Sequence, residues 1–283
     1  MTNSADLPIS DLALLLQWEG SLSNARIRDL FDVKSVRASN MIKEFRDEHP
    51  TWLVHDSKTK AFYPSSDYLS HQRKHANRRH HADELARYLA LVGLHYATQA
   101  KDEHHHLLCA HTDLTAPPPR PFAMLQSAAK GQRKVRITYR SMNHPEPHQR
   151  TISPHTLVRA GRRWHARAFC EEAGEFRDFS LGRISKVEEL GQPSERYVSD
   201  DKPWQFFVKV TLVPHPELTP EQSLVIRAEY MAGAAALTET CRGALVKYFV
   251  QDMRAAVHTQ QRPPEYQLAV SNIKEIEQWL FLK

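Results

Sequence analysis

The chain has 283 residues, and its 38 lysine and arginine side chains against 33 aspartate and glutamate side chains give a formal charge of +5. This length allows two or three domains with separate cores, and the mild basic excess is more typical of a nucleic-acid-binding protein than of an acidic one. The three cysteines form no CxxC pair and no run approaches the roughly 18 apolar residues of a membrane helix, so we exclude a disulfide framework, a zinc ribbon and a membrane partner and expect a cytoplasmic, nucleoid-associated protein.

Residues 1–68 are predicted to form a winged helix-turn-helix domain. A leucine-rich helix is followed by two short helices, for which Ser23 and Ser35 are the expected N-caps. After them, TWLVHDSKTKAFYP alternates as two strands around a polar turn. The third helix has one apolar stripe at helical spacing, formed by Ala38, Met41, Ile42 and Phe45. Three helices and a hairpin in this order are typical of a winged helix-turn-helix.

The third helix, residues 35–47, has the chemistry of a DNA recognition helix. Arg37 can donate two hydrogen bonds to guanine, and Asn40 can pair with adenine. Lysines of the helix and of the hairpin suit phosphate contacts. The candidate DNA-binding residues are Arg26, Ser35, Arg37, Ser39, Asn40, Lys43, Lys58 and Lys60. The alternatives are an ordinary solvated helical bundle and a winged helix that binds protein.

Residues 69–118 are predicted to be a helical linker or dimerisation region. One helical apolar stripe is formed by Leu85, Leu89, Val92 and Tyr96. The segment also contains a histidine cluster, which consists of His71, His75, His80, His81, His104, His105, His106 and His111. Because no Cys, Asp or Glu completes a recognised ligand spacing around them, we expect no metal and no cofactor. The prolines of TAPPPRP mark the next domain boundary.

Residues 119–195 are predicted to be a helix followed by a small antiparallel barrel or a strongly bent sheet. The strands are KVRITYR, RTISPHTLV, RRWHARAFC and EFRDFSLGRI. The polar segment GQPSERYVSDDKP is then predicted to be a linker.

Residues 203–283 are expected to form an α+β module of strand, helix, helix, strand and helix, with CRGALVKYFVQDM as its second helix and a capping box of Thr219 and Gln222. The fold class is therefore a multidomain α+β protein.

The strand RRWHARAFC has two different faces. Alternation places Trp164, Ala166, Ala168 and Cys170 on a core face, and Arg163, His165, Arg167 and Phe169 on the other. Counting by twos along the next strand gives a second row of Arg177, Phe179, Leu181 and Arg183. Two adjacent basic rows would form a groove for phosphates and stacked bases. Alternatively, the arginines are solvated or paired with Glu171, Glu172 and Asp178.

No nucleophile elbow, glycine-rich phosphate loop, carboxylate pair or nuclease-like metal motif is present in the sequence. We therefore expect no enzyme activity and no catalytic residue. Two alternatives to a DNA-binding regulator stay open, namely an RNA-binding or RNA-processing factor that uses the basic barrel, and a metal-dependent hydrolase that uses the histidine cluster.

The stretches ISPHTLVRAGRRWHARAFC and EFRDFSLGRI resemble the core of a WYL domain, which has an Sm/SH3-like barrel. A preceding winged helix and a following WCX-like module, which begins WQFFVKVTLVPHPELTPEQ, resemble the WYL-family transcriptional regulators, closest to the repressors found beside BREX and CBASS phage-defence operons. The family is named for a Trp-Tyr-Leu triplet, and this chain departs from it, because Trp164 is followed by His165 and Ala166. The ligand-binding residues that the resemblance implies are Tyr139, Ser153, His155, Trp164, His165, Arg167, Arg177 and Arg183.

This resemblance implies a homodimeric repressor that binds a palindromic double-stranded operator. The WYL domain would bind a nucleotide or oligonucleotide effector, and the C-terminal module would dimerise or regulate. His165 stands where the family has a tyrosine, and it can bind an anion when protonated.

Overall fold

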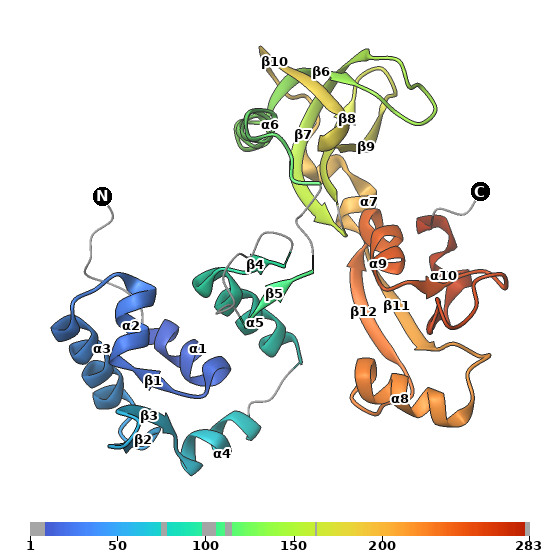
Figure 1. The fold of residues 1–283 in the computed structure, drawn as a ribbon. Coiled ribbons are helices and arrows are strands. Elements are labelled where there is room, and N and C mark those ends of the chain that lie inside the picture. The colour runs from blue at the N-terminus through green and yellow to red at the C-terminus, as the bar shows by residue number, and fades with distance from the viewer. Residues whose placement is uncertain (1–8, 75–77, 98–105, 111–114, 162, 281–283) are drawn as a thin grey trace. The chain divides into compact units, whose positions relative to one another are not determined.

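The computed structural model describes residues 9–74, 78–97, 106–110, 115–161 and 163–280. The chain divides into two compact units, residues 1–112 and 113–283 (Figure 1). No helix within these described ranges is long and apolar enough to cross a membrane.

The first unit contains the winged helix-turn-helix that the sequence predicts, followed by further helices and a short strand pair. Its elements are α1 (Ile9–Glu19), β1 (Leu22–Ser23), α2 (Asn24–Phe31), α3 (Ser35–Glu48), β2 (Leu53–Asp56), β3 (Ala61–Pro64), α4 (Ser66–Lys74), α5 (Arg78–Val92), β4 (His95–Tyr96) and β5 (Leu108–Cys109). The wing hairpin pairs β2 with β3, and β1 adds to β3 to give the antiparallel order β1-β3-β2.

Helix capping explains where α2 begins. The Ser23 side chain accepts a hydrogen bond from the backbone N–H of Arg26 at 3.2 Å, which confirms the predicted N-cap. The prediction for Ser35 is wrong, because Ser35 is the first residue of α3 and Lys34 occupies the cap position without a side-chain bond. The Ser35 hydroxyl instead donates to Asn24 Oδ1 at 3.2 Å and so ties α3 to α2.

The core of the first unit confirms the stripe predicted for α3. Leucines of α1 pack against the four buried side chains of the stripe, which are Ala38, Met41, Ile42 and Phe45. Helix α5 contributes Tyr88 to the same core, with Leu89 and Val92 packed against it. A single helical stripe from Leu85 to Tyr96 is wrong, since Leu85 is exposed and the helix ends at Val92, directly before Gly93, where φ is +75°. Tyr96 lies in β4, which pairs with β5 in parallel.

The second unit begins with a helix and an antiparallel sheet. The elements are α6 (Pro119–Gly131), β6 (Arg133–Tyr139), β7 (His148–Ala160), β8 (Arg163–Cys170), β9 (Glu175–Ser180) and β10 (Ile184–Pro193). The strand order is β10-β6-β7-β8-β9, with a register shift between Pro154 and Thr156 in the long strand β7. The strongly bent sheet was one of the two predicted forms. Among the described strands, β9 and β10 are at the two ends of this order, and no ladder joins them.

The C-terminal module of this unit is a second sheet with covering helices. Its elements are α7 (Lys202–Gln205), β11 (Phe207–Pro214), α8 (Pro220–Met231), β12 (Leu237–Arg242), α9 (Val246–Asp252), β13 (Ala255–Ala256), β14 (Leu268–Val270) and α10 (Ile273–Ile276). The sheet order is β12-β11-β14-β13. Reciprocal bonds between Thr219 and Gln222 confirm the capping box at the start of α8.

Two predictions for this module are wrong. Residues 241–253 are not one helix, because Cys241 belongs to strand β12, where it pairs with Val208, and α9 begins only at Val246. Gly243 separates the two elements, and a Cβ there would meet the Trp279 ring at 2.8 Å. The supposed linker at residues 191–203 also contains structure, since β10 runs to Pro193 and Asp201 is fully buried at the start of α7.

Candidate nucleic-acid interface and buried polar network

The side of α3 opposite its apolar stripe is exposed and carries varied polar chemistry. We call this side the recognition face, and it consists of Val36, Ser39, Asn40 and Lys43. Val36 is 75% exposed, which is high for a branched apolar side chain in a folded domain. The face offers an amide, a cation and a methyl surface within two helical turns, which are the groups that read base edges and bind phosphates.

Arg37 lies beside the recognition face and is paired along the helix. Its Nη1 donates to Glu44 Oε1 at 3.2 Å, and both side chains are partly exposed. Exposed pairs of this kind contribute about 0–1 kcal/mol, so Arg37 can exchange Glu44 for a guanine edge at low cost.

Two serines of the predicted set also connect α3 to α2. Asn24 Nδ2 donates to the carbonyl oxygen of Ser35 and to the hydroxyl of Ser39, each at 2.8 Å. These bonds fix the angle between α2 and α3, so Ser35 and Ser39 position the helix as well as facing solvent.

Arg26 is also engaged within the domain. Its guanidinium donates to Glu19 through Nε, at 3.0 Å to Oε2, and through Nη2, at 2.7 Å to Oε1. The hydrogen bonds that Arg26 donates to this carboxylate raise the pKa of Arg26. The structure therefore places this predicted phosphate contact in an ion pair between α2 and α1.

The wing lysines lie in the turn between β2 and β3. Asp56 holds the turn, because its Oδ1 accepts from the backbone N–H of Lys58 at 2.8 Å and its Oδ2 accepts from the Thr59 hydroxyl at 3.0 Å. Lys58 and Lys60 are both exposed at the turn. A wing of this kind is suited to the phosphate backbone beside a groove.

The middle of the polar face of β8 is buried, which the sequence did not predict, whereas Arg163 at its start is exposed. Ala166, Ala168 and Cys170 lie in the core as expected, and Trp164 is partly buried against Phe122, with ring centroids 5.2 Å apart. On the other face, His165 is only 8% exposed and Arg167 only 5%. Of the alternatives considered, pairing with Asp178 is the one found for Arg167.

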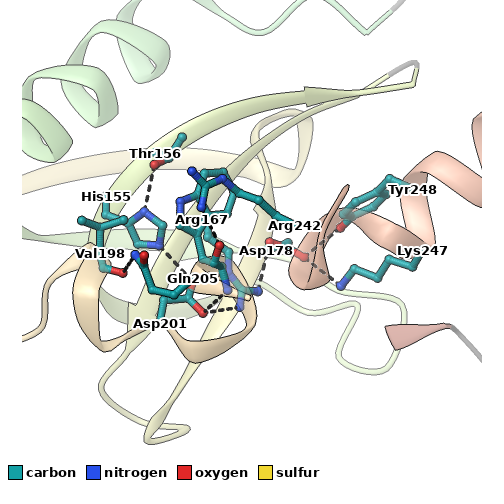
Figure 2. Close-up of polar contacts among 11 residues, drawn as sticks. His155, Thr156, Arg167, Asp178, Val198, Asp201, Gln205, Arg242, Lys247 and Tyr248 are labelled. Carbon is teal, nitrogen blue, oxygen red and sulfur yellow. Dashed lines mark hydrogen bonds and ion pairs between the residues drawn. The ribbon is translucent and has the colours of Figure 1, made fainter. Parts of the chain in front are cut away.

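Arg167 is held by two carboxylates (Figure 2). Its Nε and Nη2 donate to the two oxygens of Asp201 at 2.7 and 2.9 Å, and its Nη1 donates to Asp178 Oδ1 at 3.2 Å. Asp201 also lies 3.1 Å from His155 Nε2. Burial by itself raises the pKa of Asp201, but the hydrogen bonds from His155 and Arg167 outweigh burial and lower the pKa to about 2.

Asp178 connects this sheet to α9 of the C-terminal module (Figure 2). Its Oδ2 accepts from the Tyr248 hydroxyl at 3.0 Å and from Lys247 Nζ at 2.8 Å. The His165 ring packs on Tyr248, with centroids 4.9 Å apart. At the end of the same strand pair, Gly161 with φ +54° approaches Asp252 so closely that any Cβ would clash with its carboxylate.

We call this set the buried polar network; its members are His155, Arg167, Asp178, Asp201, Lys247 and Tyr248. Three of these side chains lie outside the first sheet: Asp201 directly precedes α7, and Lys247 and Tyr248 lie on α9. A charge buried in this way is stable only while its partners remain, because an uncompensated buried ion is strongly disfavoured.

The predicted second basic row is wrong. In the antiparallel register Ala166 pairs with Phe179 and Ala168 pairs with Arg177, so these residues of β9 share the core side of the sheet. The residue opposite Arg167 is Asp178. Arg177 is exposed and donates to Glu175 at 2.6 Å, and Arg183 lies in a 3-10 turn, where alternation by twos no longer holds.

Two other residues of the predicted ligand set are buried on the sheet. Tyr139 lies in the core and packs edge to face on Phe179, with centroids 5.2 Å apart. Ser153 is buried, and within the described part of the chain its Oγ has no hydrogen-bond partner.

For the histidine cluster, the structure shows no group of three or more His, Cys, Asp or Glu that could hold a metal ion among the residues it describes. His71 packs on Trp52, with ring centroids 5.2 Å apart. The cluster members that lie outside the described residues are His75, His104, His105 and His111.

Sequence reasoning missed the residues that complete the network. Asp201 could have been found as a helix N-cap, since it precedes Lys202 and Pro203, and Pro is favoured in a first helical turn. Nothing in the local pattern of Lys247 or Tyr248 indicates a partner on β9.

Three family models match the chain in order. They are the BrxR transcriptional regulator winged helix-turn-helix domain over residues 10–92, the WYL domain over residues 121–189, and the BrxR transcriptional regulator C-terminal dimerization domain over residues 207–276.

Similar proteins agree with these matches. The DNA-binding transcriptional repressor CapW of Pseudomonas aeruginosa is 28% identical over 270 residues, covering 93% of this chain and 87% of that protein. A repressor of the same name from Escherichia coli (strain KTE188) is 27% identical, with 92% and 87% covered. A solved structure, proteasome accessory factor B/C of Arthrobacter aurescens, is 14% identical over an alignment that covers 98% of this chain and 50% of that chain, with a TM-score of 0.29.

Proposed function

The chain belongs to the WYL-domain transcriptional regulators with BrxR-type terminal domains, and from this premise we propose that it acts as a homodimeric repressor on a palindromic operator. Its relatives are named DNA-binding transcriptional repressors, so the chain is a DNA-binding regulator and not an enzyme. The observation that carries the proposal is the recognition face of α3, which is exposed within a winged-helix domain.

Operator reading is assigned to α3 and the wing. Arg37 and Asn40 would contact base edges in the major groove, and Val36 would contact a thymine methyl group. Lys43, Lys58 and Lys60 are exposed and would contact phosphates. Two such helices in a dimer would reach half-sites about 34 Å apart, which is one turn of DNA.

The regulated gene set is proposed to be a phage-defence operon. Support comes from the resemblance to repressors found beside BREX and CBASS operons and from the BrxR-type domains at both ends. A transcriptional reporter joined to the DNA upstream of the gene tests this. Deleting the gene should raise reporter expression, and unchanged expression would contradict repression.

Ligand control is proposed to act through the WYL domain. A nucleotide or oligonucleotide would shift the protein between states that bind the operator well and poorly. The buried polar network supports this, because it joins the sheet to the C-terminal module whose family model is named for dimerization. Coupling must be reciprocal, so operator DNA should lower the affinity for the ligand by the same factor by which the ligand lowers the affinity for the operator.

A gel shift of the purified protein on DNA from upstream of its own gene tests DNA binding directly. A shift that survives both a chelator and an excess of single-stranded RNA is the expected result. Loss of the shift with RNA would favour the RNA-binding alternative, and loss with chelator would favour a metal-dependent function. The burial of His165 and Arg167 argues against an open RNA groove on this sheet face.

A further inference from the structure

The side chain of Asn24 connects the first residue of α2 to the start of α3. Its Nδ2 donates to the carbonyl oxygen of Ser35 and to the hydroxyl of Ser39, each at 2.8 Å, and its Oδ1 accepts from the Ser35 hydroxyl at 3.2 Å. Ser35 is the first residue of α3, and Ser39 lies about one turn later on the recognition face. A single amide therefore contacts both of the serines that the sequence predicts to contact DNA.

The backbone carbonyl of Ser35 determines which way this amide points. A carbonyl oxygen can only accept a hydrogen bond, so the Asn24 atom bonded to it must be the amide nitrogen and not the amide oxygen. Both hydrogens of Nδ2 are then used, one by the Ser35 carbonyl and one by the Ser39 hydroxyl. The Ser35 hydroxyl faces the amide oxygen and donates its only proton to it.

The two serine hydroxyls are thereby left with opposite capacities. Ser35 has used its proton, so its hydroxyl can only accept a further hydrogen bond. Ser39 accepts from Asn24 and keeps its proton.

The Ser39 proton also has no acceptor within its own helix. A helical serine often donates to the carbonyl four residues earlier, which for Ser39 is the Ser35 carbonyl. The two lone pairs of that carbonyl are taken by Asn24 Nδ2 and by the backbone N–H of Ser39 in the helix. The Ser39 side chain is exposed, so its proton is available to an external acceptor.

We propose that Asn24 is a positioning residue of the DNA-binding surface and makes Ser39 a hydrogen-bond donor to one acceptor atom of the operator, either on a phosphate or on a base edge in the major groove. The inference rests on the assignment of α3 as the operator-reading helix, and it names one contact and its direction. Phosphate oxygens, purine N7, guanine O6 and thymine O4 accept this proton. The amino groups of adenine and cytosine are donors in the major groove, so Ser39 selects against them at its position.

Operators that each lack one acceptor atom locate the contact. In the half-site bound by the full-length protein, every phosphate is replaced in turn by a methylphosphonate. Purine N7, guanine O6 and thymine O4 are removed in turn by 7-deazapurines, 2-aminopurine and 5-methylpyrimidin-2-one. Fluorescence anisotropy should show one position at which the wild type loses about threefold to tenfold more affinity than Ser39→Ala does. A methylphosphonate position identifies a phosphate contact, and a modified base identifies a base contact.

Asn24→Asp tests the role of Asn24 at that position. The new carboxylate has no hydrogen to donate, so the Ser39 hydroxyl turns its proton towards it and can no longer donate to DNA. The variant should therefore match Ser39→Ala at that position. Ala25→Asp is the matched control, because Ala25 is the exposed next residue of α2 and receives the same charge without contacting Ser39. It should weaken binding to all the operators alike and keep the position-specific loss of the wild type.

Asn24→Ala adds no charge and gives a second measurement. It frees one lone pair of the Ser35 carbonyl, which the Ser39 hydroxyl can then occupy, so the position-specific loss should fall below about twofold. A changed angle between α2 and α3 would alter binding to all operators, and the ratio between operators removes that uniform effect. Thermal unfolding followed by circular dichroism identifies the variants that are folded at the assay temperature, and Asn24→Ala decides alone if Asn24→Asp is unfolded.

Two results overturn the inference. One is a half-site with no position that depends on Ser39, and the other is a position-specific loss that a folded Asn24 variant retains in full. A wild-type protein that binds no DNA from upstream of its own gene loses the proposed function, whereas one that binds it without a Ser39-dependent position loses only this contact.

Discussion

The recognition face of α3 and the polar face of β8 are both rich in hydrogen-bonding side chains, yet they have opposite environments. Asn40 and Lys43 are exposed, and their binding capacity is open to an external partner. Arg167 is buried and bound on both sides by Asp178 and Asp201. A basic residue in the sequence therefore indicates a binding surface only when the folded chain does not bury it against its own carboxylates.

The two environments also set how strongly each charge is coupled to folding. An exposed pair such as Arg37 with Glu44 is screened by water and salt. A buried pair cannot lose one partner without leaving a bare charge in a low dielectric. Substitutions on the exposed face of α3 should therefore change DNA binding with little effect on stability, and substitutions in the buried polar network should lower stability.

The largest expected effect follows the loss of Asp201. Asp201→Ala leaves the Arg167 guanidinium without its bidentate partner and should lower the free energy of unfolding by about 3–5 kcal/mol. Glu175→Ala, which removes the exposed partner of Arg177, should lower it by less than about 1 kcal/mol. Urea unfolding followed by tryptophan fluorescence measures both. Equal losses would contradict the difference between the two environments.

The stability of the protein at acid pH should depend on the same network. The pKa of Asp201 in the folded protein, about 2, lies below the ordinary value of 3.8, so the ionised carboxylate stabilises the fold above about pH 4. This contribution, about 2 kcal/mol, is lost as the pH falls from 4 towards 2. Asp201→Asn should flatten this part of the profile of stability against pH. A variant with the wild-type profile would show that Asp201 does not govern acid stability.

Operator specificity should depend on Arg37. Arg37→Ala should lower the preference for operator over unrelated DNA by about 10- to 100-fold, since one bidentate base contact carries about 1–3 kcal/mol of discrimination. Lys58→Ala is the matched change in the wing. It should weaken binding to all DNA and reduce the slope of log K against log salt by about 0.9. Fluorescence anisotropy over a salt series measures both, and an unchanged preference after Arg37→Ala would reject α3 as the reading helix.

The smallest expected effect concerns Val36. Val36→Ala should weaken operator binding by about threefold to fourfold, which is the value of roughly one buried methyl-sized group. Replacing thymine by uracil in the operator removes the methyl group from the DNA side. If Val36 contacts that methyl group, the variant should show no further loss on the uracil operator. Full additivity at every thymine would place Val36 outside the groove.

The first unit could be predicted well because its pattern is local. The stripe from Ala38 to Phe45 repeats along a single helix, and the buried side of that helix determines which side is exposed. The boundary errors at Ser35 and Gly93 arise where one hydroxyl bond or one left-handed residue decides the end of an element.

The second unit could be predicted only within each strand. Arg177 and Phe179 do share a face, as counting by twos indicates. The register of β8 with β9 places Arg177 opposite Ala168 and Phe179 opposite Ala166, so both residues of β9 are on the core side. In the sequence, only the apolar side chain of Phe179 indicated that this row faces the core. The partners of Arg167 are 11 and 34 residues away in the chain, and no periodic pattern connects positions at such separations.

Operator affinity of two double variants tests most directly whether DNA binds α3 and not the sheet. Arg37→Ala with Asn40→Ala alters the reading helix, and Arg163→Ala with Arg177→Ala removes two exposed cations from the sheet domain. The helix variant should lose about 100-fold or more in operator affinity, and the sheet variant should bind within about twofold of the wild type. Loss of binding in the sheet variant with normal binding in the helix variant would contradict the assignment of α3 as the operator-binding element.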